Sequence, residues 1–357
     1  MLQYVAIFTP SLPARFRMMQ RCFSLLFGML AWSAAIALEA PAESHPGARA
    51  FAAELARDPL AIEQGLSEAA ILATLDQARY QQTIIDAISR PAESKAWKDY
   101  RPIFLTDKRI NDGVAFYRAH ADLLQRLEKE FGVPASIIVT IIGVETSYGR
   151  ITGKYRVLDA LTTLAFYYPA RAPFFQGELK QLFLLHGTRF PYATTELMGS
   201  YAGAMGWGQF MPSSIAKFAR DEDSDGKIDL WNSISDICAS VANYFTAHGW
   251  QTGGPVAVRA NVDKNARVIT PGSLEPVYPL TQLEEWGYHL GSNPGGAKPD
   301  GQTPVTLLQL EGAEGTEFWI VFQNFYVISR YNRSPLYSMA VLQLSEAITR
   351  ELSKPAQ

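Results

Sequence analysis

An apolar segment that opens at Pro134 and ends in a glutamate constrains this chain more than any other feature. Proline is typical of the first helical position. The residues that follow are strongly apolar and include Ile137, Ile138, Ile141, Ile142 and Val144. Glu145 lies four residues after Ile141 and three after Ile142, so helical spacing puts its carboxylate on the same face as these isoleucines. We therefore expect a helix that carries a carboxylate on an apolar stripe.

Such a carboxylate is expected to have altered acid–base chemistry. Removal from water favours the protonated form of an acid, and cleavage of a glycosidic bond needs a proton donor at the leaving oxygen. The alternative is a buried ion pair between Glu145 and either Arg150 or Arg156. On periodicity alone, the ion pair is the favoured interpretation.

A second segment, residues 199–209, changes that balance because it combines glycines with aromatic and polar residues. Glycine lets the backbone approach a ligand closely, and aromatic faces stack on sugar rings. The segment holds Gly199, Ser200, Tyr201, Gly203, Met205, Gly206, Trp207, Gly208 and Gln209. It favours a saccharide-binding site, and the alternative is a turn with only a structural role.

The pattern along the chain predicts an α+β protein that is mainly α. Residues 38–254 are expected to be helical, with helices over 114–131, 155–166, 173–186, 213–219 and 234–248, the first ending at Gly132. Short runs rich in Val, Leu, Phe and Trp then predict a small β-rich subdomain over 255–323, with strands at 255–262, 303–310 and 317–322. Residues 324–357 return to helix, and Ser334 and Pro335 are typical of the start of the last one.

The N-terminus, residues 1–37, is predicted to be a signal peptide. Three arginines precede an apolar run over residues 23–37, which ends in the small-x-small sequence Ala35-Ile36-Ala37. The run is short for a membrane span, although an uncleaved leader would attach the protein to a membrane. A lipid-attachment cysteine follows such a run, whereas Cys22 precedes it. We expect an exported periplasmic protein that is not a lipoprotein.

Composition excludes several other classes. The chain is 48% hydrophobic and 19% charged, which is typical of a globular protein and not of a disordered one. Its net charge of −3, without a basic patch, argues against a nucleic-acid partner. Outside the leader only Cys238 remains, so no internal disulfide is expected. We expect a monomer.

Longer motifs around both segments resemble the lytic murein transglycosylase B family. They are Gly-Val-Glu-Thr-Ser-Tyr-Gly-Arg over 143–150, followed by Leu-Asp-Ala-Leu over 158–161, and the run 200–214. The resemblance continues through 242–245 and 326–332 and covers roughly residues 48–345. Motifs of this length, in this order, are highly specific.

The resemblance implies a lysozyme-like helical core with an N-terminal helical part and a small β domain. It also implies non-hydrolytic cleavage of the β-1,4 bond between N-acetylmuramic acid and N-acetylglucosamine, without a catalytic cofactor. By matching position, Glu145 would be the catalytic acid that then acts as base. The implied glycan-binding residues are Tyr100, Ser200, Gln209, Tyr244, Tyr331 and Asn332. The implied partners are peptidoglycan glycan strands, and other cell-wall enzymes are further candidates.

Two other functions stay open. A muramidase-type hydrolase would add water and commonly uses two carboxylates. The nearest acid downstream of Glu145 is Asp159, and sequence distance does not exclude a partner in space. A non-catalytic peptidoglycan-binding protein would have no need of an acid on an apolar stripe.

The acidic segment 221–232 fits an EF-hand calcium loop at positions 1, 3, 5, 6 and 9. Asn232 stands at position 12, where that motif has glutamate. The family has a longer loop, so Asp236 would supply the missing carboxylate, and Lys227 would contribute only its backbone carbonyl. The candidate ligands of a structural calcium ion are Asp221, Asp223, Asp225, Lys227 and Asp236. The alternative is a solvated acidic turn.

Overall fold

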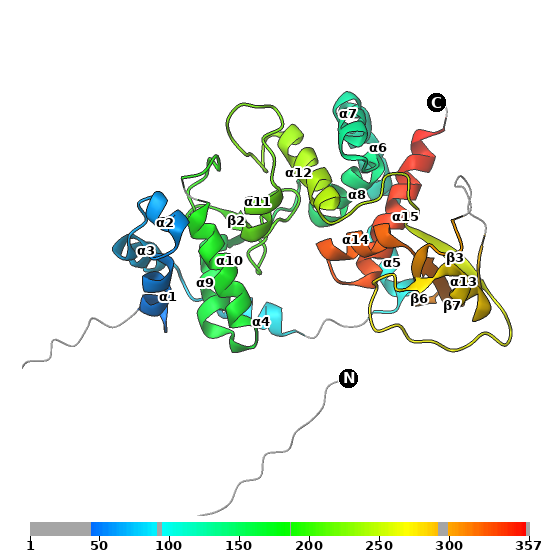
Figure 1. Cartoon of the computed structure of the whole chain (residues 1–357). Coiled ribbons are helices and arrows are strands. Elements are labelled where there is room, and N and C mark those ends of the chain that lie inside the picture. The colour runs from blue at the N-terminus through cyan, green and yellow to red at the C-terminus, as the bar shows by residue number, and fades with distance from the viewer. Residues whose placement is uncertain (1–43, 91–94, 186, 292–298, 355–357) are drawn as a thin grey trace, which may run out of the picture. The chain divides into compact units, whose positions relative to one another are not determined.

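A computed structural model describes residues 44–90, 95–185, 187–291 and 299–354 (Figure 1). The chain divides into two units, Met1–Ala42 and Glu43–Gln357, and every described residue belongs to the second. The predicted signal peptide and Cys22 lie outside the described residues. Within the described part, none of the helices combines the length and the apolar character needed to cross a membrane.

The centre of the fold is helix α8 (Ala135–Thr146), the apolar helix expected from the sequence. Helices pack around it on several sides; they are α6 (Asp107–Ala119), α7 (Ala121–Phe131), α12 (Ile234–Ala247) and α15 (Pro335–Leu352). Residues 137–143 are all buried, so α8 is covered almost all round and not along one stripe. The prediction that α8 carries its apolar residues along one stripe was therefore wrong, because the helix is buried on nearly all sides. Glu145 meets solvent because it lies in the last turn of this central helix.

Other helices precede and follow α8 in the sequence (Figure 1). Helix α1 packs on α3, α4 packs on α9, and α10 packs on both α9 and α11. Their bounds are Ala48–Leu55 for α1, Pro59–Glu63 for α2, Glu68–Leu75 for α3, Gln82–Ser89 for α4, Trp97–Phe104 for α5, Val157–Tyr167 for α9, Ala172–Leu184 for α10 and Pro212–Phe218 for α11. A two-stranded sheet joins β1 (Tyr155–Arg156) to β2 (Met198–Gly199).

The single helix predicted over residues 114–131 is in fact two helices. The backbone leaves helical geometry at His120, where φ is −126° and ψ is 26°. Its ring lies 4.7 Å from that of Phe116, centroid to centroid, which packs the break against the core. Apolar residues on both sides of the break are buried. Their spacing along the sequence therefore resembled that of one continuous helix. Gly132, in the left-handed conformation, ends α7 as predicted.

The predicted β-rich region contains a five-stranded antiparallel sheet in the order β4-β6-β7-β3-β5. The bounds are Ala257–Val262 for β3, Tyr278–Pro279 for β4, Tyr288–Leu290 for β5, Pro304–Gly312 for β6 and Gly315–Val321 for β7. The three predicted strands correspond to β3, β6 and β7. A short helix, α13 (Leu280–Glu285), packs on β4, β5 and β6. The chain then enters α14 (Gln323–Tyr331) and α15.

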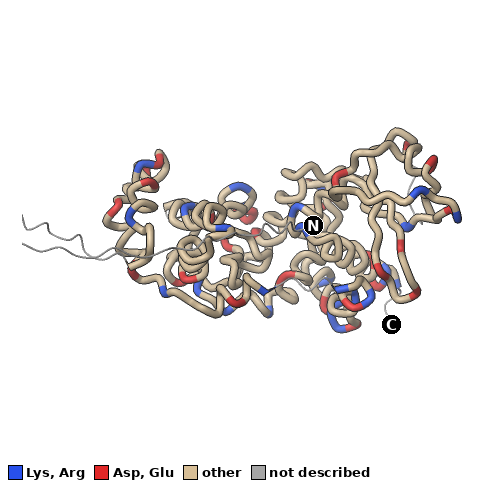
Figure 2. Tube along the Cα trace, turned by 90° about the horizontal axis from the view of Figure 1, so that it is seen from below, with Lys and Arg blue, Asp and Glu red and all other residues tan. Residues whose placement is uncertain are grey.

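The sheet shares part of its core with the helices. Leu308 of β6 and Val321 of β7 pack in one cluster with Trp97 of α5, Phe325 of α14 and Met339 of α15. This cluster holds α5, α14 and α15 together. Charged residues of both signs are interspersed along the described trace (Figure 2).

Candidate active site

Glu145 lies where α8 ends in a sharp left-handed turn. The three residues Ser147, Tyr148 and Gly149 have φ values of 51°, 60° and 79°, so the chain leaves the helix at Ser147, two residues after the glutamate. The side chain of Glu145 keeps partial contact with solvent. Its burial nevertheless raises the pKa to about 7, although a hydrogen bond from Tyr337 acts in the opposite direction. A pKa near 7 leaves a substantial fraction of the Glu145 carboxyl group protonated at neutral pH.

The alternative of a buried ion pair at Glu145 is wrong. Arg150 forms its ion pair with Asp112, and Arg156 forms one with Asp159 at 2.5 Å. Among the described residues, no salt bridge reaches Glu145. Without a cation beside it, the carboxylate has nothing to offset its desolvation except hydrogen bonding.

Tyrosines from three helices surround Glu145. Tyr337 of α15 donates a hydrogen bond to Glu145 Oε1 at 2.6 Å. Burial raises the pKa of Tyr100 of α5, of Tyr331 of α14 and of Tyr337, and the negative charge of Glu145 adds to each shift. All three phenols are therefore neutral hydrogen-bond donors close to the carboxylate.

Tyr244 of α12 belongs to the same group through Tyr331. The two rings lie 4.7 Å apart, centroid to centroid, and the Tyr244 phenol donates to the backbone carbonyl of Arg330 at 2.7 Å. Tyr331 in turn donates to the carbonyl of Gly208 at 2.5 Å. The predicted residues Tyr100, Tyr244 and Tyr331 are thus brought together near Glu145.

The glycine-rich segment lies directly against the end of α8. Thr146 donates from Oγ1 to the carbonyl of Trp207 at 3.0 Å. The amide of Gln209 donates to the carbonyls of Thr152 and Gly206, at 3.1 and 2.9 Å. A Cβ on Gly149 would lie 2.1 Å from the Trp207 ring, so this close approach requires glycine. Glu145 and the segment therefore form one local structure.

Ser200 and Asn332 lie outside helices and strands, and their side chains bind backbone N–H groups. Ser200 Oγ accepts from the backbone N–H groups of Ala202 and Ala204. Asn332 is exposed, and its Oδ1 accepts from the N–H of Ser334 between α14 and α15. Neither side chain hydrogen-bonds to Glu145 within the described residues. A glycan-binding role for Ser200, Gln209 and Asn332 stays a prediction.

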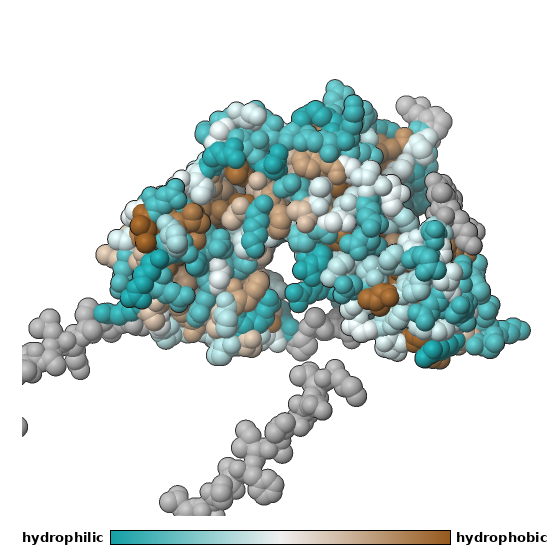
Figure 3. All heavy atoms as spheres, viewed as in Figure 1, coloured by the Kyte–Doolittle hydropathy of each residue, from teal (hydrophilic) through white to brown (hydrophobic). Residues whose placement is uncertain are grey.

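Elements from two sides of a surface hollow contribute these residues. Figure 3 shows the hollow between the part that carries α9–α11 and the part that carries α14 and the sheet. The glycine-rich segment follows β2 and precedes α11, whereas Tyr100 and Tyr331 come from α5 and α14.

No second carboxylate takes part in the electrostatics of Glu145 within the described part of the chain. Burial and the bond from Tyr337 are the causes of its shifted pKa. Asp159 is buried elsewhere, where it accepts from the Arg156 guanidinium and from the backbone N–H of Arg79. The arrangement favours chemistry in which a single carboxyl group acts first as a general acid and then as a general base.

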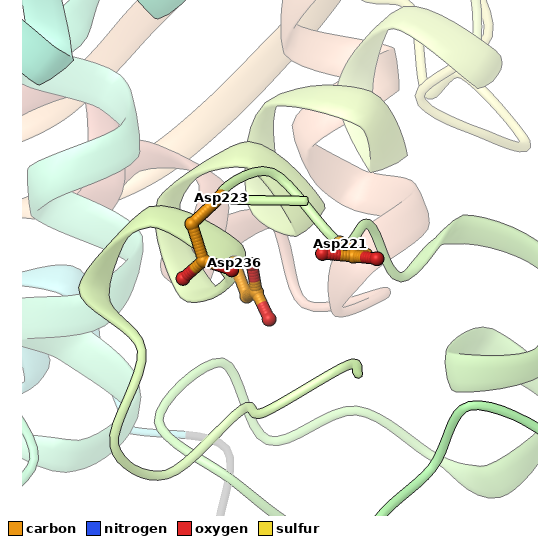
Figure 4. Close-up of side chains that lie close together, drawn as sticks. All are labelled: Asp221, Asp223 and Asp236. Carbon is orange, nitrogen blue, oxygen red and sulfur yellow. The ribbon is translucent and has the colours of Figure 1, made fainter. Parts of the chain in front are cut away.

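Three of the predicted metal ligands converge. Asp221, Asp223 and Asp236 each offer a carboxylate oxygen, and these oxygens lie within 4.8 Å of one another (Figure 4). Asp236 is buried, and its two oxygens accept from the N–H groups of Glu222 and Asp229. Asp221 Oδ1 is buried and has no hydrogen-bond partner among the described residues. This oxygen donor set fits calcium, which prefers carboxylates. Asp225 is not part of this group, and its Oδ1 accepts from the N–H of Lys227 at 2.8 Å.

Comparison with known proteins identifies the family. Residues 47–346 match the family model described as "Transglycosylase SLT domain". The chain belongs to this family. It is 41% identical over 288 residues to membrane-bound lytic murein transglycosylase B of Escherichia coli K12, covering 80% of this chain and 77% of that one. The chain is therefore a lytic transglycosylase acting on peptidoglycan, as the motifs predicted.

Solved structures of similar proteins confirm the lysozyme-like fold. Soluble lytic transglycosylase SltB1 of Pseudomonas aeruginosa is 45% identical, with a TM-score of 0.79 over 86% of this chain and 99% of that chain. Lytic transglycosylase Slt35 of Escherichia coli, solved in complex with calcium, is 38% identical, with a TM-score of 0.76 over 87% and 95%. SltB3 of Pseudomonas aeruginosa, solved in complex with NAG-anhNAM-pentapeptide, is 28% identical, with a TM-score of 0.69 over 84% and 78%.

Tyr337 is the site residue that sequence reasoning missed. Ser334 was expected to begin the last helix, and its Oγ does accept from the N–H of Tyr337. That cap places Tyr337 in the first turn of α15. The sequence contains no local signal that this turn faces a carboxylate 192 residues earlier.

Proposed function

We propose that this lytic transglycosylase cleaves the β-1,4 bond between N-acetylmuramic acid and N-acetylglucosamine and leaves 1,6-anhydromuramic ends, with Glu145 as its single catalytic carboxylate. The observation that carries the proposal is the state of Glu145. Its pKa is raised to about 7, and neither an ion pair nor a second acid among the described residues contributes to that shift. Such a group gives and accepts a proton with similar ease at neutral pH.

Glu145 takes part in two proton transfers during the reaction. Protonated Glu145 gives its proton to the glycosidic oxygen as the bond from this oxygen to the muramyl C1 breaks. The resulting carboxylate then takes the proton of the muramyl 6-hydroxyl, whose oxygen bonds to C1 and closes the anhydro ring. Glu145 ends protonated, and water does not enter the product. The Tyr337 hydrogen bond stabilises the carboxylate between the two steps.

We infer that the glycan strand binds beside Glu145 along Tyr100, Ser200, Gln209, Tyr244, Tyr331 and Asn332. The partly exposed rings of Tyr100 and Tyr331 suit stacking on sugars. The hydroxyl, amide and backbone groups near Ser200, Gln209 and Asn332 suit hydrogen bonding to sugar hydroxyls. The SltB3 structure with NAG-anhNAM-pentapeptide is consistent with a peptidoglycan fragment as ligand.

We propose that the acidic loop holds a structural calcium ion. The proposed ligands are Asp221, Asp223 and Asp236, joined by Asp225 and the backbone carbonyl of Lys227. The unpartnered Oδ1 of Asp221 within the described structure and the calcium complex of Slt35 support it. The loop joins α11 to α12, and its Leu230 carbonyl accepts from the N–H of Trp207 in the glycine-rich segment at 3.0 Å, so the ion would stabilise the site and take no part in the chemistry.

We also propose export to the periplasm through the signal peptide over residues 1–37. Peptidoglycan lies outside the cytoplasmic membrane, so a cleaving enzyme must be exported. The Escherichia coli relative is described as membrane-bound, and an uncleaved leader would attach this chain to a membrane.

Digestion of purified sacculi by the wild type and by Glu145→Gln tests the function. We expect the wild type to release anhydromuramyl products, identified by mass spectrometry as one water lighter than hydrolysis products. The variant should keep glycan binding and lose cleavage by roughly a thousandfold, as expected for loss of a general acid. Hydrated products would indicate a muramidase, and a wild type that only binds would indicate a non-catalytic protein. Full activity in Glu145→Gln would overturn the assignment of the acid.

A further inference from the structure

A cavity of about 640 Å³ lies between the β sheet and the junction of α14 with α15. One side is formed by Leu307, Leu308 and Gln309 of β6. Another is formed by the loop over residues 269–274, and the third by the segment from Tyr326 to Pro335. The sheet, the loop and the α14–α15 junction thus enclose a space that Glu145 does not line.

The cavity is positively charged. Arg330 and Arg333 both line it, both are exposed, and no Asp or Glu is among the described residues of its lining. The Arg330 guanidinium lies 5.8 Å from the centroid of the Tyr326 ring. Within the described part of the chain, neither guanidinium forms a salt bridge or a hydrogen bond. Two arginines without acidic partners beside one cavity are suited to an anionic ligand.

The cavity adjoins the proposed glycan site. Arg330 and Arg333 directly flank Tyr331 and Asn332, two of the proposed glycan contacts. Pro335 begins α15 two residues before Tyr337, which binds Glu145. A ligand in this cavity would therefore sit beside a sugar bound near the catalytic acid.

We propose that this cavity binds the peptide that is attached to the muramic acid sugar, with Arg333 and Arg330 contacting its carboxylates. The inference rests on the proposed function of the neighbouring groove. A peptide linked to the sugar through its N-terminus ends in a free carboxylate, and the planar fork of arginine binds carboxylates through two parallel hydrogen bonds. The apolar side chains of Leu274, Leu307 and Leu308 suit the aliphatic part of a peptide.

The geometry separates this role from binding of the glycan itself. Strands from which the peptide has been removed keep one lactyl carboxylate close to each muramic acid ring, but they lack the peptide and the terminal carboxylate that the two arginines would contact. Arg333 makes no hydrogen bond, ion pair or ring contact within the described residues, and its side chain is exposed. Its replacement should therefore leave the fold and the catalytic group intact and act only on the peptide.

The test compares two substrates made from the same glycan strands, one with peptides and one from which an amidase has removed them. For Arg333→Gln we expect kcat/KM on the peptide-bearing strands to fall by about three- to fivefold, the range for charged contacts that remain in water. On stripped strands the change should stay below about twofold. Arg333→Lys keeps the charge and should recover part of the loss.

Arg118→Gln is the matched control. Arg118 is an exposed arginine of α6 that lines a different cavity, together with Pro134 at the opposite end of α8 from Glu145. This variant removes the same charge and should change neither rate. An equal loss on both substrates in Arg333→Gln, or no loss on either, would overturn the proposal.

Binding keeps the peptide site testable independently of catalysis. The chain carrying Glu145→Gln is titrated with both kinds of strand, with and without Arg333→Gln. If peptide-bearing strands bind more tightly than stripped strands and Arg333→Gln removes the difference, the peptide site is supported. This holds even if the wild type cleaves neither kind of strand, a result that would contradict only the proposed function. If the Glu145→Gln chain binds peptide-bearing and stripped strands equally well, the proposed peptide site is wrong, whatever the cleavage experiments show.

Discussion

Tyr337 donates its phenolic hydrogen to Oε1 of Glu145 across 2.6 Å, from the first turn of α15 to the last turn of α8. The bond favours the carboxylate, whereas burial favours the protonated acid, and burial is the larger effect. Their balance leaves the pKa of Glu145 at about 7. A group that must first lose a proton and then recover one benefits from such a balance.

Replacing Tyr337 with phenylalanine should disturb that balance in a defined direction. Without the donated hydrogen bond, the pKa of Glu145 rises further, so the alkaline limb of the pH–rate profile moves to higher pH. We expect kcat at the optimum to fall by about tenfold, because the carboxylate intermediate loses a charge-assisted hydrogen bond. The measurement is kcat for anhydromuramyl release between pH 5 and pH 9, a range of roughly two units on either side of the raised pKa.

Tyr117→Phe is the control for that change. Tyr117 is half-buried on α6, and it lines the cavity at the far end of α8 with Pro134. It should leave both kcat and the pH profile as they are in the wild type. An alkaline limb that stays in place, or moves to lower pH, in Tyr337→Phe would contradict our account of Glu145.

The raised pKa of Glu145 also predicts how stability depends on pH. Its folded pKa of about 7 exceeds the ordinary glutamate pKa of 4.5, so the folded chain binds more protons than the unfolded chain within this window. The free energy of unfolding therefore falls as pH rises from 4.5 towards 7. Above pH 7 the folded chain carries the full destabilisation from the desolvated Glu145 carboxylate. Glu145→Gln removes this cost, and we expect it to stabilise the chain by about 1–3 kcal/mol at pH 8, which is a gain of several degrees in Tm.

Calorimetry at two pH values checks this. At pH 4, where the acid is protonated in both states, the variant and the wild type should have closely similar Tm values. Glu314→Gln, in the exposed turn between β6 and β7, removes a charge that is not desolvated and should show no such pH-dependent gain. A Glu145→Gln chain that is equally stabilised at both pH values would show that desolvation of Glu145 is not the cause.

Much of the fold followed from local signals. Pro134 before the isoleucine-rich run correctly predicted α8, and Ser334 with Pro335 predicted the start of α15, because capping depends on neighbours in sequence. The strand runs predicted at 255–262, 303–310 and 317–322 were recognisable by their composition. The break at His120 could not be recognised from the sequence, because apolar residues continue on both sides of it. Tertiary packing decides where the helix ends.

The site was less predictable because its contacts are long-range. Local spacing offered Arg150 and Arg156 as partners of Glu145, but Asp112 and Asp159 bind them instead. The true partner, Tyr337, comes from another helix. Family motifs supplied the positions of Tyr100, Tyr244 and Tyr331, which no periodicity could have connected to Glu145. Periodicity also misjudged α8 itself, which is buried nearly all round.

The acidic loop predicts a calcium-dependent stability. Calcium that binds only the folded chain should raise its stability by about 2.7 kcal/mol at a free concentration 100 times Kd, and a chelator should reverse this. Asp236→Asn should abolish the response, because Asp236 is the buried member of the group. Burial and the charges of Asp223 and Asp221 raise the pKa of Asp236, so calcium binding should also weaken as pH falls. The measurement is Tm at increasing calcium.

Lys227→Ala is the matched control for the loop, because only the backbone carbonyl of Lys227 is a proposed ligand. Its calcium response should equal that of the wild type, while the loop loses a positive charge. If Asp236→Asn responds to calcium as the wild type does, the carboxylates that converge at Asp221, Asp223 and Asp236 do not form the site.

Two glycine-to-alanine substitutions should have opposite effects, because only one of the glycines is required by its surroundings. Gly177 lies exposed inside α10, and apart from its chain neighbours and the backbone of its own helix no atom lies within 4 Å of the position that a Cβ would take there. Gly177→Ala should therefore stabilise the chain by about 0.5–1 kcal/mol. Gly149 has φ of 79°, and an added Cβ would lie 2.1 Å from the Trp207 ring. Gly149→Ala should cost at least about 2 kcal/mol, since left-handed strain and the clash add.

The loss in Gly149→Ala should extend to activity. The backbone carbonyl of Trp207 accepts a hydrogen bond from Thr146, the neighbour of Glu145, so displacing the Trp207 ring shifts the glycine-rich segment away from the acid. We expect kcat/KM to fall by about tenfold or more at a temperature where the chain is still folded, as expected when a supporting contact misplaces the substrate by about 1 Å. Chemical denaturation and sacculus digestion on the same samples separate the two effects. Full activity in a destabilised Gly149→Ala chain would mean that the contact between Gly149 and Trp207 serves only the fold.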